Sequence, residues 1–176
     1  MLAEAVSDVE GPHLFAALYA QLRQLAQSAL RRGGPHLTLS PTTLLHEVYL
    51  NISRQQSVCF PDRSHFMAYA SRAMRGLIVD YARERRAHKR GGQFEITSLP
   101  TLEPPHLEAE VNLGRLSDAL DELSGVDAAL AELVDLKFFC GFSFAEIAAL
   151  RCMSERTVQR DWNKARLYLH GVMQGE

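Results

Sequence analysis

Apolar residues recur every three or four positions along most of this chain of 176 residues. The spacing is regular over residues 12–32 and again over residues 64–88. A repeat of 3.6 residues places such side chains on one face of a helix. No stretch alternates apolar and polar residues for long enough to indicate a convincing strand. The sequence therefore predicts an all-α fold.

Glycine, proline and serine mark where these helices begin and end. Gly33-Gly34 follows the first predicted helix, about Pro12 to Arg32, and Gly91-Gly92 follows the third, about Ser64 to His88. Glycine is the commonest residue just beyond a helix C-terminus. The second helix is predicted to start at Ser40-Pro41, because serine caps helices well and proline suits the first helical position.

Residues 93–110 separate two groups of predicted helices. They contain Pro100, Pro104 and Pro105 and show no clear period, which is typical of a linker. The prediction is two small helical domains, residues 1–92 and 111–176. In the second domain, one helix is expected to end at about Leu123 and the next to end near Gly141. Two short helices are expected to follow.

Composition argues against several classes of protein. No apolar run is long enough to span a membrane, and residues 1–10 lack the basic start of a secretory signal. The three cysteines are scattered, which indicates neither a disulfide framework nor a zinc ribbon and favours a cytoplasmic protein. The histidines are dispersed and no HExxH, GxSxG or P-loop motif occurs. We therefore expect a protein that is not an enzyme and needs no metal or cofactor.

Charge is strongly segregated along the chain, although the net charge is only −2. Residues 72–90 contain seven basic and two acidic side chains, a net charge of +5. Residues 95–135 contain ten acidic side chains and one basic, a net charge of −9. A local basic patch of this size indicates nucleic acid as a partner even where the whole chain is acidic.

The C-terminal residues carry the clearest motif. Ser143 followed by Glu146 is a capping box, and Ser154 is placed to cap a further helix after a turn at 151–153. This pattern predicts a helix-turn-helix, whose second helix enters the major groove of DNA. An αα-hairpin with a solvated polar face is the plainer alternative. The residues predicted to face outward and contact DNA are Arg156, Thr157, Gln159, Arg160, Asn163 and Lys164.

The predicted helix over 64–88 combines aromatic and basic side chains. Cations that follow the backbone and rings that stack on unpaired bases are typical of single-stranded nucleic-acid binding. Helical spacing favours a core position for Phe66 and Tyr81, whereas Tyr69 lies off the apolar stripe. The alternative is a solvated arginine face with no ligand. The predicted contacts with melted DNA are Tyr69, Arg72, Arg75, Arg83, Arg85 and Arg86.

Together these segments resemble the extracytoplasmic-function sigma family of bacterial transcription initiation factors. The family's polymerase-binding helix is similar to the segment Leu44-Leu45-His46-Glu47-Val48-Tyr49-Leu50. The helix that opens the minus-ten element in that family is similar to residues 65–70 and 78–83. The domain that reads the minus-thirty-five element is similar to three further segments, residues 120–123, 142–148 and 154–158.

The resemblance implies a sigma factor whose partners are core RNA polymerase, through its β′ subunit, and promoter DNA. The resemblance places polymerase contacts at Leu44, Leu45, Glu47 and Tyr49.

The chain departs from the family pattern just before that segment. Many members carry an acidic cluster there, whereas this chain has Ser40, Pro41, Thr42 and Thr43. Some members that lack the cluster resemble this sequence and are linked with Ser/Thr protein kinases. Phosphate on Thr42 or Thr43 adds about −1.5 to −2 charge at a helix N-terminus, where anions are favoured. The alternative is that both threonines are ordinary first-turn residues.

Two other functions fit an all-α chain of this kind. One is a helix-turn-helix regulator that binds duplex DNA without core polymerase. The other is a protein-only adaptor or anti-sigma module. An adaptor has no need for a cationic outward face, so Arg156, Gln159, Arg160 and Lys164 distinguish it from a DNA-binding protein.

Overall fold

Four helices form the N-terminal half of the chain in the computed structural model, which describes residues 9–33, 37–54, 59–91 and 105–174. They are α1 (Gly11–Ala17), α2 (Tyr19–Gly33), α3 (Pro41–Arg54) and α4 (Arg63–Gly91). The only strands among the described residues are β1 (Val9–Glu10) and β2 (Cys59–Phe60), which pair antiparallel with Val9 opposite Phe60. The all-α prediction is confirmed.

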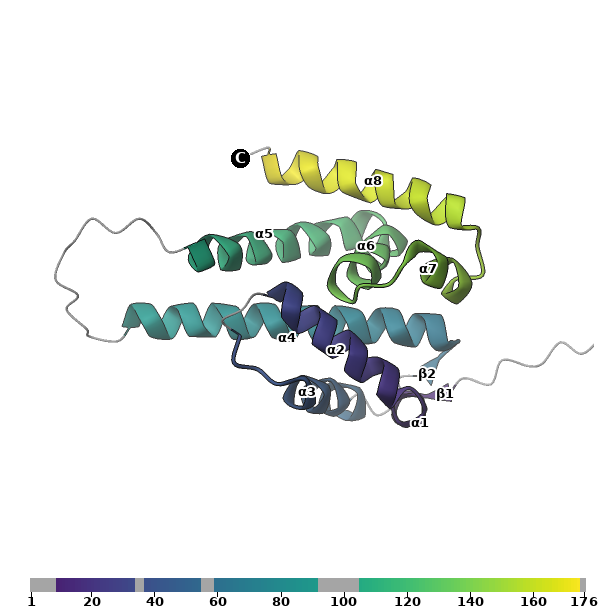
Figure 1. Cartoon of the computed structure of the whole chain (residues 1–176), viewed down its shortest axis with the longest axis horizontal. Helices are drawn as coiled ribbons and strands as arrows, with labels where there is room; N and C mark the ends of the chain where they lie inside the picture. The colour runs from purple at the N-terminus through teal and green to yellow at the C-terminus, as the bar shows by residue number, and fades with distance from the viewer. Residues whose placement is uncertain (1–8, 34–36, 55–58, 92–104, 175–176) are drawn as a thin grey trace, which may run out of the picture.

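The first predicted helix is interrupted at Leu18, where α1 ends and α2 begins. Backbone hydrogen bonds of 2.9 Å from Leu18 N to Leu14 O and from Leu22 N to Leu18 O continue across the interruption. Figure 1 shows α1 turned away from the axis of α2. The turn lets buried Phe15 pack edge-on against Tyr49 of α3, with 5.2 Å between the ring centroids. A single straight helix over 12–32 was therefore the wrong expectation.

Side-chain caps set the starts of α3 and α4. Ser40 Oγ accepts a hydrogen bond of 3.0 Å from Thr43 N, as the sequence predicts for α3. Asp62 Oδ1 accepts one of 2.9 Å from His65 N at the start of α4. Both helices bury an apolar stripe, on α4 including Phe66, which is a core residue as predicted.

The C-terminal half contains α5 (Pro105–Val126), α6 (Ala128–Val134), the π-helical segment η1 (Asp135–Phe139), α7 (Phe144–Leu150) and α8 (Glu155–Gln174). The start of α5 at Pro105 lies inside the interval predicted as a linker. Proline is compatible with the first turn of a helix, so Pro105 begins a helix where the sequence suggested a break. The remainder of that interval, 93–104, lies outside the described residues.

The two halves pack on each other rather than standing apart. In Figure 1, α5 lies along α4, and α8 covers the opposite side of α5. Contacts of α4 with α5 and η1, and of α2 with η1, join the halves. Buried apolar residues from both halves form one continuous core.

Candidate nucleic-acid interface

Reciprocal caps define the helix-turn-helix formed by α7 and α8. Ser143 Oγ accepts from Glu146 N (3.1 Å), and Glu146 Oε2 accepts from Ser143 N (2.7 Å). These hydrogen bonds from Ser143 hold the pKa of Glu146 below its ordinary value. Ser154 Oγ accepts from Thr157 N (3.2 Å) at the start of α8. Both caps lie where the sequence predicts them.

The turn between the two helices is held in one shape. Cys152 has φ of +52°, in the left-handed region that few residues other than glycine adopt. Arg151 Nη1 donates to the carbonyl of Ala129 on α6 (3.0 Å), which ties the turn to the rest of the domain. Trp162 of α8 meets Phe144 of α7 edge-on, with 6.2 Å between the centroids. The second helix is therefore presented on a fixed support.

The N-terminal half of α8 presents a polar face to solvent. The Thr157 hydroxyl is half-buried and lies 2.8 Å from Ser154 Oγ. Asp161 lies on the same surface, with its Oδ1 3.6 Å from both Arg160 Nε and Lys164 Nζ. The exposed members of the predicted DNA-contacting set are Arg156, Gln159, Arg160, Asn163 and Lys164.

A groove of about 510 Å³ runs between α3 and α4. Tyr69 and Arg72, both predicted to contact melted DNA, line it beside Asn51 and Arg54. Tyr69 is half-buried and its ring lies 5.4 Å from that of Phe60. The groove therefore combines an aromatic face with exposed cations.

The remaining arginines of α4 differ in their surroundings. Arg83 is half-exposed, and its Nη2 lies 2.6 Å from Asp118 Oδ1 of α5. Arg85 is partly buried, and its Nη1 has no hydrogen-bond partner among the described residues. The side chain of Arg86 lies outside the described part of the chain.

Arg75 does not lie on the DNA-facing surface that the sequence predicts. Its side chain is only 2% exposed and donates from Nε to Asp135 Oδ1 (2.7 Å). Nη1 donates to Ser117 Oγ (2.7 Å), and Nη2 donates to Asp121 Oδ1 (3.1 Å). Every hydrogen-bond partner of this guanidinium comes from the C-terminal half, which covers this side of α4.

The polymerase-binding prediction on α3 divides into buried and exposed residues. Leu44 and Leu45 are 0% and 2% exposed, so both side chains pack in the core. Glu47 is partly exposed and Tyr49 is 38% exposed. The surface of α3 left for a partner is therefore its polar side with the Tyr49 ring.

The hydroxyls at the start of α3 also differ from one another. Thr43 Oγ1 lies 2.8 Å from Ser40 Oγ, so the two hydroxyls share a hydrogen bond. Thr42 is exposed on the same turn. Both threonines are at the surface, and Thr42 is the one whose hydroxyl lies outside the cap.

Burial dominates the electrostatics between the halves. It raises the pKa of Asp135 to about 6, against the lowering effect of Arg75. It also raises the pKa of Cys140 to about 12, against the lowering effect of the hydrogen bond between the Cys140 sulfur and Ser71 Oγ, which are 3.1 Å apart. Removing one partner of a buried ion pair typically costs 3–5 kcal/mol of stability. Arg75 and Asp135 therefore each stabilise the buried position of the other.

Asp135 should make the folded chain less stable as the pH rises from about 4 to above about 6. Its folded-state pKa exceeds the unfolded value of 3.8, so this contribution is complete below 3.8 and lost as the pH passes about 6. The charged groups that face it are Arg75 and Arg72 of α4 and Asp121 of α5. Denaturant unfolding of wild type and Asp135→Asn at about pH 4 and about pH 7.5 measures the effect.

The difference in unfolding free energy between these two proteins should change across that window, because asparagine does not titrate. Carboxylates with lowered pKa, such as Glu146, act in the opposite direction and cancel in the difference. A difference that stays constant from about pH 4 to 7.5 contradicts the prediction.

Sequence reasoning did not find the partners of Arg75. Ser117, Asp121 and Asp135 lie 42, 46 and 60 residues away along the chain. The available signal was the pairing of one strongly basic segment with one strongly acidic segment. That signal indicates attraction between the segments but does not select particular residues.

The described residues hold no group of three or more His, Cys, Asp or Glu side chains suited to a metal ion. Within the same residues, no helix is both long enough and apolar enough to cross a membrane.

Comparison with known proteins connects this geometry to a family. No curated protein sequence matches the chain. A family model described as ECF sigma factor matches residues 7–175. That match includes the capped helix-turn-helix, the groove beside α4 and the helix α3. Because it extends over almost the whole chain, the protein belongs to the ECF sigma factor family and acts as an RNA polymerase sigma factor, with core RNA polymerase and promoter DNA as its partners.

Proposed function

We propose that the two halves of this sigma factor divide promoter recognition between them. Residues 1–92 bind polymerase and open the minus-ten element, and residues 111–176 read the minus-thirty-five element. The observation that carries this division is the exposed polar face of α8, presented by a doubly capped helix-turn-helix. The motif resembles a duplex-reading unit, whereas the groove beside α4 resembles a single-strand site.

The exposed side chains of α8 suit base edges in the major groove. Arginine binds guanine with two hydrogen bonds, and glutamine or asparagine binds adenine in the same way. We assign Arg156, Gln159 and Arg160 to base contacts and Lys164 to a phosphate. Thr157 is half-buried and contributes less surface to such a contact.

The groove between α3 and α4 suits an unpaired base. Tyr69 offers a ring that is packed against Phe60 on one side, and Arg72 offers a cation on the same rim. Stacking of a base on an aromatic side chain contributes about 1–3 kcal/mol. We assign this groove to the melted strand, with Arg83, Arg85 and Arg86 along the backbone.

Tyr69→Ala should reduce open-complex formation more than initial promoter binding, because a base stacks only after it has unpaired. Tyr69→Phe keeps the ring and should retain most of the activity. Permanganate footprinting on duplex and on pre-melted templates separates the two steps. An equal defect in duplex binding, or loss of folding by Tyr69→Ala, would remove Tyr69 from the melting step.

The first turn of α3 is assigned to regulated docking on polymerase. Ser40, Thr42 and Thr43 supply no negative charge where many family members have acids. Phosphorylation of Thr42 or Thr43 by a Ser/Thr kinase would supply it, beside Glu47 and Tyr49 on the exposed side of the helix.

Reconstituted transcription tests the proposed division. The chain with core polymerase should initiate at specific promoters, whereas neither component should do so alone, and kinase treatment should increase the yield. Co-purification with core polymerase provides the matching binding measurement. Tight promoter binding by the isolated chain, without association with core polymerase, would instead indicate a helix-turn-helix regulator that works alone.

A further inference from the structure

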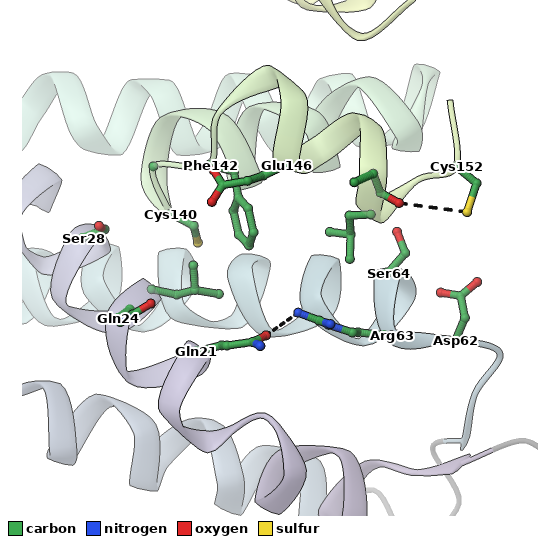
Figure 2. Close-up of a pocket in the computed structure, with 14 residues that line it drawn as sticks. Gln21, Gln24, Ser28, Asp62, Arg63, Ser64, Cys140, Phe142, Glu146 and Cys152 are labelled. Carbon is green, nitrogen blue, oxygen red and sulfur yellow. Dashed lines mark hydrogen bonds between the residues drawn. The ribbon is translucent and has the colours of Figure 1, made fainter. Parts of the chain in front are cut away.

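Arg85 carries an unsatisfied donor near the C-terminal end of α4. Its side chain is partly buried, and its Nη1 is shielded from solvent without a hydrogen-bond partner among the described residues. Arg63, at the start of the same helix, instead donates to Gln21 of α2, as Figure 2 shows. A buried donor without an acceptor is unfavourable, and more so when the group is charged. Arg85 therefore marks a place for an acceptor that the described residues do not supply.

Tyr81 connects Arg85 to the segment that precedes α3. It lies four residues before Arg85, and side chains with this spacing are neighbours on a helix, with about 5–6 Å between their Cβ atoms. The Tyr81 hydroxyl is hydrogen-bonded to Thr38 Oγ1. Figure 1 shows the segment before α3 passing beside α4. The Thr38 hydroxyl is thus held at the part of α4 that carries Arg85.

Thr38 is accessible to a modifying enzyme. Its side chain is exposed, and residues 37–40 belong to no helix or strand. An enzyme can therefore reach this hydroxyl without unwinding a helix. The Thr43 hydroxyl, by contrast, is bonded to Ser40 Oγ at the cap of α3.

We propose that Thr38 is a phosphorylation site and that Arg85 binds the phosphate. A Ser/Thr kinase transfers the γ-phosphoryl group of ATP. A bond forms between Thr38 Oγ1 and the γ-phosphorus, the bond from that phosphorus to the bridging oxygen of ADP breaks, and the hydroxyl proton passes to a base of the kinase. The product carries about −1.5 to −2 charge and three strong acceptor oxygens. Arginine binds phosphate through two parallel N–H donors, so Nη1 of Arg85 gains the acceptor that it lacks.

Phosphate at this position opposes the binding of DNA to α4, a consequence that rests on the proposed function. Arg85 is one of the arginines assigned to the backbone of the melted strand, and the phosphate on Thr38 competes for it. Residues 72–90 carry a net charge of +5, which one phosphate reduces locally to about +3. Phosphate on Thr38 therefore acts against DNA binding, whereas phosphate on Thr42 or Thr43 is proposed to promote polymerase binding.

Phosphorus NMR titration of the full chain, with phosphothreonine incorporated at position 38, tests the pairing with Arg85. The second pKa of an unpaired phosphothreonine is about 6. Beside Arg85 this pKa should fall to about 5, because an opposite charge favours the dianion. Arg85→Met should restore a pKa of about 6.

Arg83→Met is the matched control for this titration. Arg83 lies two residues before Arg85, about 200° around the helix, and is paired with Asp118. Its replacement removes the same charge from the same helix and should leave the pKa at about 5. A pKa near 6 without any substitution, or an equal rise in both variants, overturns the phosphate site.

Affinity for an oligothymidine of about 12 nucleotides tests the competition with DNA. Phosphate on Thr38 should weaken binding about tenfold, and by much less in the Arg85→Met background, where the shared cation is absent. The Arg83→Met background should retain the tenfold loss. Equal losses in all three backgrounds overturn the competition. If the unmodified chain does not bind the oligonucleotide, the proposed groove is refuted, while the NMR titration still decides the phosphate site.

Mass spectrometry of the protein recovered from the cells that produce it, with phosphatases inhibited, tests whether the site is used. We expect a fraction of the chains to carry phosphate on Thr38. Phosphate on Thr42 or Thr43 alone overturns the modification of Thr38 and leaves the proposed docking switch intact. Absence of phosphate from all three threonines overturns both.

Discussion

Alanine at both Thr42 and Thr43 should abolish activation by a Ser/Thr kinase while leaving the fold intact. Both side chains are exposed, and Ser40 remains to cap α3 through Thr43 N. The phosphorylated wild type should bind core polymerase about 10- to 100-fold more tightly than the unmodified chain. That range corresponds to about 1.5–3 kcal/mol for hydrogen bonds to a charged group on a basic docking surface. The favourable effect of phosphate on its own helix terminus, about 0.3–1 kcal/mol, is smaller.

Affinity for core polymerase with and without kinase treatment measures this effect, together with mass-spectrometric mapping of the modified residue. We expect Thr42→Ala to lose more of the response than Thr43→Ala, since the Thr43 hydroxyl is bonded to Ser40. Thr42→Ser/Thr43→Ser keeps two acceptor hydroxyls and is the matched control. Full-strength binding by the unmodified chain would show a constitutive sigma factor, and Glu47 would then be the first docking residue to replace.

Arg156→Ala and Arg160→Ala should each weaken recognition of the upstream element by about 1–3 kcal/mol, which is about 5- to 150-fold. Both side chains lie on the exposed face of α8, away from the buried residues Val158 and Ala165. Binding to core polymerase should be unchanged, because the proposed polymerase-binding surface lies on α3. The measurement is affinity of the polymerase complex for promoters with matched and mismatched upstream elements.

Lys164→Ala is the comparison that separates base contacts from phosphate contacts. It should weaken binding to all sequences alike and reduce the salt dependence of binding. If Arg156→Ala and Arg160→Ala behave in the same uniform way, they are phosphate contacts. If neither changes affinity, another face of α8 meets the DNA.

Local signals in the sequence were sufficient for the N-terminal caps of α3, α7 and α8. Ser40, Ser143 and Ser154 each accept the hydrogen bond expected of an N-cap, because capping depends only on residues within one turn. The exposed face of α8 followed in the same way from the spacing of its buried residues. These features required no knowledge of distant contacts.

The side-chain surroundings that local patterns did not predict have one physical origin in tertiary packing. Leu44-Leu45 matched a polymerase-binding pattern, yet both side chains fill the core between α2, α3 and α4. Arg75 lies in a basic segment of the kind that contacts DNA, yet its hydrogen-bond partners lie more than 40 residues away in sequence. Periodicity states which residues share a helix face, but it does not state which faces a second group of helices will cover.

The π-helical turn of η1 has a consequence for how this region tolerates insertions and deletions. Cys140 N donates to the carbonyl of Asp135 (3.1 Å), so the turn holds one residue more than an α-helical turn of the same extent. Asp135 faces Arg75 while Phe139, at the other end of the turn, is fully buried. Deleting one residue would restore α-helical geometry and rotate one end relative to the other by about 100°. Either the carboxylate or the ring would then turn away from its partner, so we expect homologues that keep both to keep the length of this turn.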